Sequence, residues 1–390
     1  MKTAWKFWPK FLLAAAMSFG GTVSLFAQEP IVPPLHIEGR RILDAKNQVI
    51  RLRAANWYGF DQKEFVAGGL DHAPLAAIIE QIHALGLNAI RLPWANETLE
   101  KDPVVADKVV KSNPQFRGKH AMEVMDALIA ALAHDQILVI LDNHVSRADW
   151  CCKDDDGNGL WYNADYPEEK WLADWRAITL RYKHQPWVVG ADLRNELRSG
   201  AAWGGDDAKL DWHAAAERGG NAVLAVNPKL LIMVEGPEYS TNLTAFAKLP
   251  VRLRVASRLV YSPHAYASEK INFSSYEEMK QVFDARAGYL QYQDPPVALW
   301  VGEFGTCQTL DCGVNSQWFE WFVRYLQENN LSWGYWPLNG TQSSGYSRAY
   351  DAVESYGLLS TDWQHIAAPR IHELFRSIES PSEPLNLQAQ

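Results

Sequence analysis

The sequence predicts an α/β fold that consists of a single (β/α)8 barrel. Short apolar or β-branched runs alternate with amphipathic stretches along the body of the chain, and this alternation is typical of a parallel sheet. Eight such units between residues 52 and 336 suit a closed TIM barrel better than two doubly wound domains. No Gly/Ser/Pro-rich linker divides this body, so we expect one domain over 28–376.

The chain begins with a segment typical of secretory signal peptides. Basic residues precede an apolar run over 11–27, and several prolines follow it. We expect cleavage after Ala27, which makes 1–27 a signal peptide and the mature protein secreted, either extracellular or periplasmic. An uncleaved membrane anchor is the alternative, because the run is close to the shortest length that spans a bilayer. No comparable apolar run recurs, so we expect no stable membrane insertion once this segment is removed.

The remaining elements follow in order along the chain. Residues 36–48 alternate weakly and predict a small hairpin lid. The expected strands are 52–56, 89–92, 138–142, 188–193, 230–234, 259–262, 298–301 and 333–336. The expected helices include 74–85, 121–134, 170–183, 210–226, 275–290 and 315–330. The polar end over 377–390, which contains two prolines, predicts a flexible tail.

Composition excludes some classes of function and favours another. The 390 residues carry 37 Lys and Arg against 46 Asp and Glu, a net charge of −9, which argues against a nucleic-acid partner because such a protein needs a basic face. Phosphate-binding loops, zinc helices, dinucleotide fingerprints and serine-nucleophile elbows are missing from the sequence. The 17 Trp exceed what a core requires. Since indole faces stack on the apolar faces of sugars, a carbohydrate partner is favoured.

Four cysteines allow three disulfide pairings in an exported protein. A local bridge between Cys307 and Cys312 would leave either a bridge between the neighbours Cys151 and Cys152 or two free thiols there. Cross-pairing of the two loops is equally open. The spacing matches no zinc site, and we expect no metal and no cofactor.

One acidic run resembles a calcium-binding loop. Asp154, Asp156 and Asn158 alternate before Gly159, and Asp165 stands where the final Glu of such a loop would be. The flanking helices of a calcium loop are missing, so a loop at the edge of a cleft is the other interpretation.

Polar side chains gather at or just after the ends of the predicted strands, where active sites of this fold lie. They are Arg91 on the second strand, His144 on the third, Asn195 and Glu196 on the fourth, His264 and Tyr266 on the sixth, Glu303 on the seventh and Trp336 on the eighth. Each alone is weak evidence, but six of eight strands direct such groups at one rim. The sequence therefore predicts an active site at the carboxyl end of the barrel.

The pattern of these residues resembles that of glycoside hydrolase family 5, the cellulase-type retaining glycosidases of clan A. The resemblance extends from about Leu35 to Phe375. The pair Asn195-Glu196 is similar to the family's Asn-Glu pair after strand four, and Glu303 in Trp-Val-Gly-Glu-Phe-Gly is similar to its residue after strand seven. The resemblance implies that Glu196 is the acid/base and Glu303 the nucleophile. It places the other six residues of the rim in substrate binding.

Retaining hydrolysis requires two carboxyls about 5–5.5 Å apart with different pKa values. We expect Arg91 and the Tyr266 hydroxyl to hold Glu303 ionised, while apolar neighbours and the charge of Glu303 raise the pKa of Glu196. We expect Asn195 to bind the sugar 2-hydroxyl and Trp336 to form the floor beneath the sugar.

Further residues near the rim have two interpretations. Glu97, Asp142, Glu235 and Glu238 are interpreted as supporting or cleft groups, because none stands in an equally specific context. Trp57, Trp94, Trp150, Trp161 and Trp203 are sugar platforms or core residues.

The function expected is an endo-acting β-1,4-glucanase on cellulose or a soluble analogue, and a monomer with a polysaccharide or oligosaccharide as its partner. An alternative keeps the mechanism and changes the substrate to mannan, xyloglucan, a β-1,3 or β-1,6 glucan, or a glycolipid. A non-catalytic carbohydrate-binding barrel is a third interpretation, which the presence of both Glu196 and Glu303 opposes.

Overall fold

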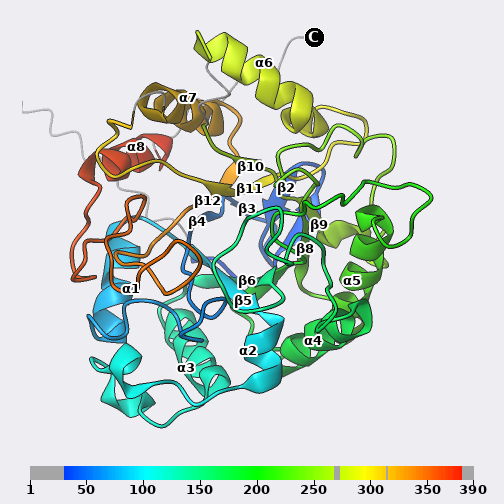
Figure 1. Cartoon of the computed structure of the whole chain (residues 1–390). Helices are drawn as coiled ribbons and strands as arrows, with labels where there is room; N and C mark the ends of the chain where they lie inside the picture. Colours follow the sequence, from blue (N-terminus) through cyan, green and yellow to red (C-terminus); the bar gives the residue numbers. More distant parts are fainter. Residues whose placement is uncertain (1–29, 268–272, 313–314, 380–390) are drawn as a thin grey trace, which may run out of the picture. The chain divides into compact units, whose positions relative to one another are not determined.

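The computed structural model describes residues 30–267, 273–312 and 315–379, in which parallel strands form a closed barrel surrounded by helices (Figure 1). The strands of the barrel sheet are β4 (Arg53–Asn56), β5 (Ala89–Ala95), β6 (Leu138–Val145), β7 (Val188–Asp192), β8 (Leu231–Val234), β9 (Leu259–Tyr261), β10 (His264–Ala265), β11 (Trp300–Phe304) and β12 (Ser332–Tyr335). Together β9 and β10 form the sixth strand of the barrel. A bridge between Tyr261 and Leu299 joins β9 to the segment that leads into β11, which closes the ring. The predicted (β/α)8 fold is confirmed.

Helices cover the outside of the barrel, as the alternating pattern predicts (Figure 1). They are α1 (Leu75–Ala84), α2 (Asn96–Lys101), α3 (Ala121–His134), α4 (Glu168–Arg181), α5 (Trp212–Val226), α6 (Tyr276–Arg286), α7 (Asn315–Glu328) and α8 (Pro369–Glu379), with 3-10 turns at Asp107–Val110, Pro114–Phe116, Ala256–Arg258 and Gly288–Gln291. The expected range 121–134 coincides with α3. The helix expected over 275–290 ends earlier, at Arg286, because Ala287 has a non-helical backbone and a separate 3-10 turn follows it.

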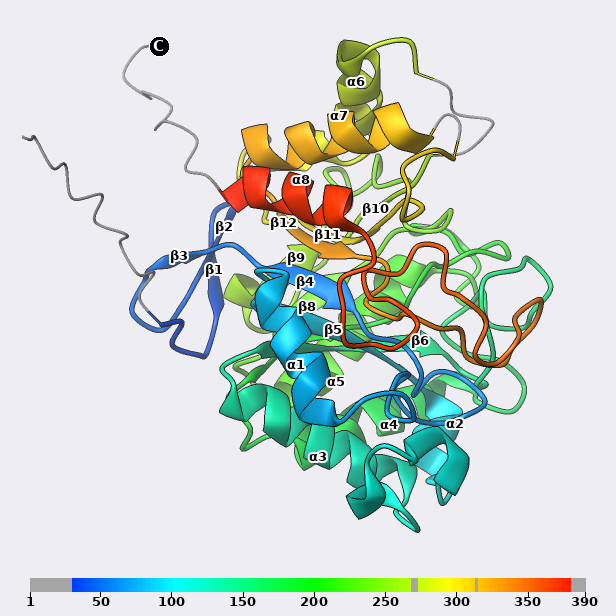
Figure 2. The same cartoon turned by 90° about the vertical axis from the view of Figure 1, so that its left-hand side faces the viewer.

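The expected hairpin over 36–48 is a three-stranded antiparallel sheet of β1 (His36–Glu38), β2 (Arg41–Leu43) and β3 (Val49–Ile50). Figure 2 shows this sheet at the end of the barrel opposite the long loops. Leu35 and Ile42 are buried in one cluster with the first inward-facing residues of the barrel strands. The sheet therefore closes the amino-terminal end of the barrel rather than covering the active-site end.

Strand residues alternate between two cores. Ile90 and Leu92 of β5 belong to the cluster between strands and helices, whereas Ala89 belongs to the cluster inside the barrel. The next inward position of β5 is Arg91, which is fully buried. The interior of the barrel thus changes from apolar to charged along one strand, because alternate residues face the same side.

Two strands run further than expected. His144 lies within β6 and Glu303 within β11, where Glu303 pairs in register with His264 of β10. These two side chains therefore project from paired strands rather than from loops.

The expected segments at the two ends of the chain fall differently. The signal peptide expected over 1–27 lies outside the described residues. Helix α8 continues to Glu379 and so includes the first three residues of the tail expected over 377–390, and Phe375 and Ile378 of this helix are buried in the core. From Ile31 onward the chain groups into one compact unit. Within the described part of the chain, no helix combines the length and apolar character needed to cross a membrane.

Candidate active site

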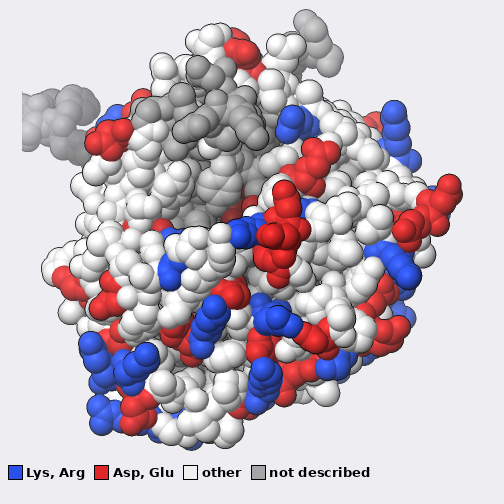
Figure 3. All heavy atoms as spheres, in the orientation of Figure 1, with Lys and Arg blue, Asp and Glu red and all other residues white. Residues whose placement is uncertain are grey.

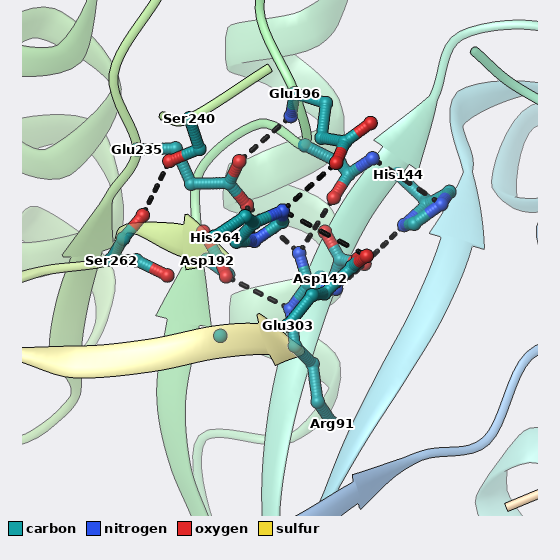
Figure 4. A network of polar contacts seen from close by, with 12 residues as sticks. Arg91, Asp142, His144, Asp192, Glu196, Glu235, Ser240, Ser262, His264 and Glu303 are labelled. Atoms are coloured by element: carbon teal, nitrogen blue, oxygen red, sulfur yellow. Dashed lines mark hydrogen bonds and ion pairs between the residues drawn. The ribbon is translucent and has the colours of Figure 1, made fainter. Parts of the chain in front are cut away.

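Arg91 is the centre of the polar network at the carboxyl end of the barrel (Figure 4). Its guanidinium is fully buried and donates to Glu303 Oε1 at 2.7 Å and to Asn195 Oδ1 at 3.0 Å. It also donates to Asp192 Oδ2 at 3.0 Å and to Glu235 Oε1 at 2.9 Å. A planar cation with five donors therefore fixes four acceptors from three strand ends, those of β7, β8 and β11.

Glu196 and Glu303 meet at this end of the barrel. One carboxylate oxygen of each lies within 4.8 Å of the other and of a ring nitrogen of His264. Glu303 projects from β11, whereas Glu196 follows β7 with a left-handed backbone (φ 44°) that turns its side chain toward the cleft. A residue other than glycine rarely adopts this backbone conformation unless its surroundings hold it. The backbone N–H of Glu196 donates to Glu235 Oε2 at 2.7 Å, which secures the turn.

Glu235 is a site residue whose importance sequence analysis missed. It is fully buried, accepts from Arg91 and from the Glu196 backbone, and one of its oxygens lies 3.2 Å from His264 Nε2. Its position at the end of β8, two residues beyond inward-facing Met233, was the available signal. Glu235 supports the residues that surround the cleft rather than facing the cleft itself.

His264 lies between the acids and sets the order of their pKa values. Burial alone would lower the pKa of His264, but the charges of Glu235 and Glu303 and hydrogen bonds to Glu196 and Glu235 raise it well above its ordinary value. His264 Nδ1 donates to Glu196 Oε1 at 3.1 Å. Burial acts to raise the pKa of Glu196, yet this hydrogen bond and the charge of His264 bring it below its ordinary value.

Glu303 shows the opposite shift. Burial raises its pKa, and the charges of His264 and Arg91 oppose this without restoring the ordinary value. The two pKa shifts therefore run in the directions opposite to those expected, lowered at Glu196 and raised at Glu303. The expectation considered Arg91 and Tyr266 at Glu303 but left out the hydrogen bond from His264 to Glu196.

Tyr266 remains a hydrogen-bond donor to Glu303. Its hydroxyl donates to Glu303 Oε2 at 3.0 Å. Burial, followed by the charge of Glu303, raises the pKa of Tyr266 well above its ordinary value, so the hydroxyl stays protonated. With Arg91 on Oε1, both oxygens of Glu303 have a fixed partner, which orients the carboxyl.

His144 and Asn195 form a second chain of hydrogen bonds beside the two acids. Burial lowers the pKa of His144, which favours the neutral ring. Its Nδ1 donates to Asp142 Oδ2 at 2.6 Å, so Nε2 accepts from Asn195 Nδ2 at 3.3 Å. Because Asn195 Oδ1 accepts from Arg91, the orientation of its amide is determined.

The cleft above these residues has a volume of about 380 Å³, and its walls include Trp336, Trp150 and Tyr356. The Trp336 ring packs parallel to the rings of His144 and Tyr58, with centroid distances of 5.3 and 5.5 Å. The loops after β6 and β12 add residues that sequence analysis did not single out for the cleft: Cys151, Cys152, Arg348 and Glu354. Cys151 and Cys152 directly follow Trp150, whereas Arg348 and Glu354 lie well beyond Trp336, where no sequence motif marks them.

Only Trp150 among the five expected rim tryptophans lines this cleft. Trp57, Trp94 and Trp161 are buried in the core, and Trp203 stacks on Phe246 with centroids 3.5 Å apart. The platform interpretation is wrong for the three buried tryptophans, because a position after a strand does not determine which way a side chain points.

In the acidic run that resembles a calcium loop, the carboxylates bind side chains of the protein. Asp156 pairs with Arg198 at 2.5 Å, Asp165 pairs with Arg147, and Asp154 accepts from the Tyr239 hydroxyl. Among the described residues, the clusters of side chains close enough to share a metal ion include none of these acids. The loop is organised by ion pairs rather than by converging ligands.

The four cysteines form the two local bridges, Cys151–Cys152 and Cys307–Cys312. Cross-pairing, which the sequence left open, does not occur. The surface around the cleft mixes acidic and basic side chains, and Figure 3 shows no continuous basic area on this face.

All eight residues predicted from the strand ends meet in one site. His144, Glu196, Tyr266, Glu303 and Trp336 line the cleft, and Arg91, Asn195 and His264 bind them from beneath. The expected acids Glu97 and Glu238 lie elsewhere: Glu97 pairs with Lys101, and Glu238 accepts from Asn242.

Comparisons with known proteins agree with this geometry. Residues 43–342 match the family described as Cellulase (glycosyl hydrolase family 5). The chain is 32% identical over 377 residues to an endoglucanase of Paenibacillus polymyxa, covering 91% of this chain and 89% of the relative. It is 33% identical over 346 residues to the major extracellular endoglucanase of Xanthomonas campestris pv. campestris, covering 84% of this chain and 67% of the relative.

Solved structures are similar as well. The catalytic domain of the Xanthomonas campestris enzyme superposes with a TM-score of 0.77 at 30% identity, covering 88% of this chain and 99% of that domain. An endocellulase of Pyrococcus horikoshii in complex with cellotetraose gives a TM-score of 0.77 at 26% identity, covering 90% of this chain and all of the other.

Proposed function

The chain belongs to glycosyl hydrolase family 5 and is a glycoside hydrolase of the cellulase type, and we propose that it cleaves internal β-1,4-glucosidic bonds of glucans with retention of configuration. The observation that carries the proposal is the meeting of Glu196 and Glu303, with carboxylate oxygens within 4.8 Å of one another. Such a distance suits a double displacement, whereas inverting enzymes need about 6.5–9.5 Å between carboxyls to admit a water molecule.

We assign the attack to Glu303. Its carboxylate forms a bond to the anomeric carbon while the bond from that carbon to the leaving oxygen breaks. Arg91 and Tyr266 hold both carboxylate oxygens, which limits the rotation of the nucleophile. Holding a reactant in the geometry of attack removes much of the entropic part of the barrier.

We assign the proton transfers to Glu196. In the free protein the proton lies in the hydrogen bond from His264 Nδ1 to Glu196 Oε1, and its movement to Glu196 gives the neutral acid that protonates the leaving oxygen. Glu196 then removes a proton from water as the water attacks the intermediate, which releases Glu303. Glu235, which faces the other nitrogen of His264, stabilises the charged ring in the free protein.

The remaining residues of the site bind the sugar. Asn195 is held by Arg91 with its NH2 group directed to the cleft side, where it can donate to a 2-hydroxyl. Trp336 supplies an aromatic face at the wall of the cleft. No step of this scheme requires a metal ion or an organic cofactor from outside the chain.

The choice of glucan rests on the relatives. The endoglucanase of Paenibacillus polymyxa aligns over 89% of its length, and one solved relative is described in complex with cellotetraose. Mannan, xyloglucan, a β-1,3 or β-1,6 glucan and a glycolipid remain the alternative substrates of the same mechanism. We further propose that 1–27 is removed on export, that the catalytic domain acts outside the cytoplasm, and that it does so as a monomer.

Hydrolysis of a panel of polysaccharides tests this proposal. We expect the highest kcat/KM on carboxymethyl cellulose or mixed-linkage glucan, with a rapid fall in viscosity that indicates internal cleavage. Proton NMR of cellotetraose hydrolysis should show the β-anomer first. An α-anomer formed first would contradict the double displacement, and a higher kcat/KM on mannan or xyloglucan would replace the proposed substrate.

A further inference from the structure

The Cys151–Cys152 disulfide lies in the cleft, beside the residues that act on the substrate. Both cysteines line the cleft together with Glu196 and Glu303. Cys151 Sγ is 3.6 Å from His144 Nε2, and Asn195 Nδ2 is 3.9 Å from Cys151 Sγ and 3.8 Å from Cys152 Sγ. Both sulfurs also lie within 4.8 Å of a carboxylate oxygen of Glu196.

The loop that carries the pair is fixed on both sides. Before it, Asp149 Oδ1 accepts from the backbone N–H of Trp150 at 2.8 Å and of Tyr346 at 2.9 Å. After it, Arg198 donates to the Lys153 carbonyl at 2.9 Å. The sulfurs are therefore held against Asn195 by contacts from the loop after β12 and from the segment after Glu196.

We propose that this disulfide is a positioning element of the active site: it holds the amide of Asn195 for the sugar 2-hydroxyl, and its reduction slows hydrolysis. The proposal rests on the function proposed above. It concerns Cys151 and Cys152 alone, because Cys307 and Cys312 do not line the cleft.

Hydrogen bonding explains why the bridged form suits this position. Arg91 fixes Asn195 Oδ1, so the NH2 group of Asn195 faces His144 Nε2 and the two sulfurs. Disulfide sulfurs can only accept. A thiol can donate as well, so a reduced Cys151 would compete with Asn195 for His144 Nε2, its neighbour at 3.6 Å.

Reduction also changes the surroundings of Glu196. A dithiol reductant transfers two electrons and two protons to the S–S bond and leaves as its own cyclic disulfide, so two thiols replace the bridge. The thiols can separate, rotate and ionise near pH 8.5. At a pH well below that value both thiols stay neutral, so the loss of activity comes through Asn195 alone.

The test uses a variant in which only one bridge can be reduced. In Cys307→Ser/Cys312→Ser protein, dithiothreitol should lower kcat on dinitrophenyl β-cellobioside at least tenfold while KM changes less than threefold. The same treatment of Cys151→Ser/Cys152→Ser protein should have no further effect. Circular dichroism establishes that both variants keep their fold after reduction.

A second substrate distinguishes positioning of Asn195 from general disruption. In a substrate whose glycone lacks the 2-hydroxyl, Asn195 has no group of the sugar to bind. Reduction should therefore lower kcat on this substrate less than threefold. An equal loss on both substrates, a loss confined to KM, or no loss on either would overturn the inference. If the oxidised protein hydrolyses neither substrate, the proposed function has failed instead.

Protection by bound sugar provides a measurement that does not depend on turnover. In Glu303→Gln protein, saturating cellotetraose should slow reduction and alkylation of Cys151 and Cys152 at least fivefold, with Cys307 and Cys312 unchanged, as measured by peptide mass spectrometry. Equal rates with and without cellotetraose would show that the bridge lies outside the occupied cleft and would contradict the proposal.

Discussion

The two ends of the barrel interior are built from the same strands but from opposite chemistry. On β6, Leu138 and Ile140 face an apolar cluster, whereas Asp142 and His144 face the charged network. On β8, Met233 belongs to the apolar cluster and Glu235, just past the strand, binds Arg91. The difference separates two tasks. Burial of apolar surface at one end stabilises the fold, while the charged end, where burial opposes ionisation, holds the residues to which we assign the reaction.

The pKa values at the charged end show how strongly burial opposes the ionisation of its acids. Burial raises the pKa of Asp142 to about 7 and that of Asp192 to about 6, although Arg91 lies beside both. A fold selected for stability alone would avoid so many buried acids around one guanidinium. Changes at the two ends should therefore have separable consequences.

The largest effect is expected at Glu303. Replacing Glu303 by Gln should reduce kcat on cello-oligosaccharides at least a thousandfold, because the amide cannot attack the anomeric carbon. The midpoint of thermal unfolding should stay within a few degrees of the parent or rise, since a buried acid is removed. Steady-state kinetics and calorimetry measure the two effects. A loss of less than tenfold, about 1.4 kcal/mol in the barrier, would show that another carboxylate attacks.

The opposite pattern is expected at the apolar end. Leu138 is fully buried, so Leu138→Ala should cost about 2–5 kcal/mol of the free energy of unfolding through lost burial and the cavity that remains. The protein that stays folded should keep kcat within threefold of the parent. Urea unfolding, with kinetics well below the midpoint, measures both. A large fall in kcat without loss of stability would break the separation between the two ends.

A smaller effect is expected on the pH profile. Burial and the charge of Glu196 raise the pKa of Glu303, which must be ionised to attack. In the parent, the acid limb of the kcat/KM profile should therefore have its midpoint above the ordinary pKa of a Glu side chain. Replacing Glu196 by Gln removes one charge that raises the pKa of Glu303, so the acid limb should move to lower pH.

This profile is measured with a dinitrophenyl glycoside, whose departure requires no proton from Glu196. Leu138→Ala is the matched control and should leave the limb in place. A shift to higher pH in Glu196→Gln would mean that Glu196 lowers the pKa of Glu303.

The same comparison explains how far sequence reasoning could reach. The barrel and the convergence of the eight rim residues followed from the alternation of strands and from polar residues at strand ends. Glu235 was undervalued because its role depends on Arg91 and on the backbone of Glu196, which meet it only in the folded barrel. The order of the pKa values was missed for the same reason, since the His264–Glu196 contact joins residues 68 positions apart. The wall that Cys151, Cys152 and Arg348 form depends on the paths of two long loops, which no local pattern determines.

The roles of Glu196 and Glu303 are the central claim, and azide rescue tests them most directly. Glu196→Ala should still form the glycosyl intermediate from a dinitrophenyl glycoside, because this leaving group needs no acid, and the intermediate should accumulate without a base to activate water. Azide attacks without a base, so it should restore turnover and give the β-glycosyl azide. Glu303→Ala has no nucleophile, so azide can attack only the substrate itself and should give the α-glycosyl azide. NMR of the products decides the matter: a β-azide from Glu196→Ala supports the assignment, and an α-azide from it would show that the two roles are reversed.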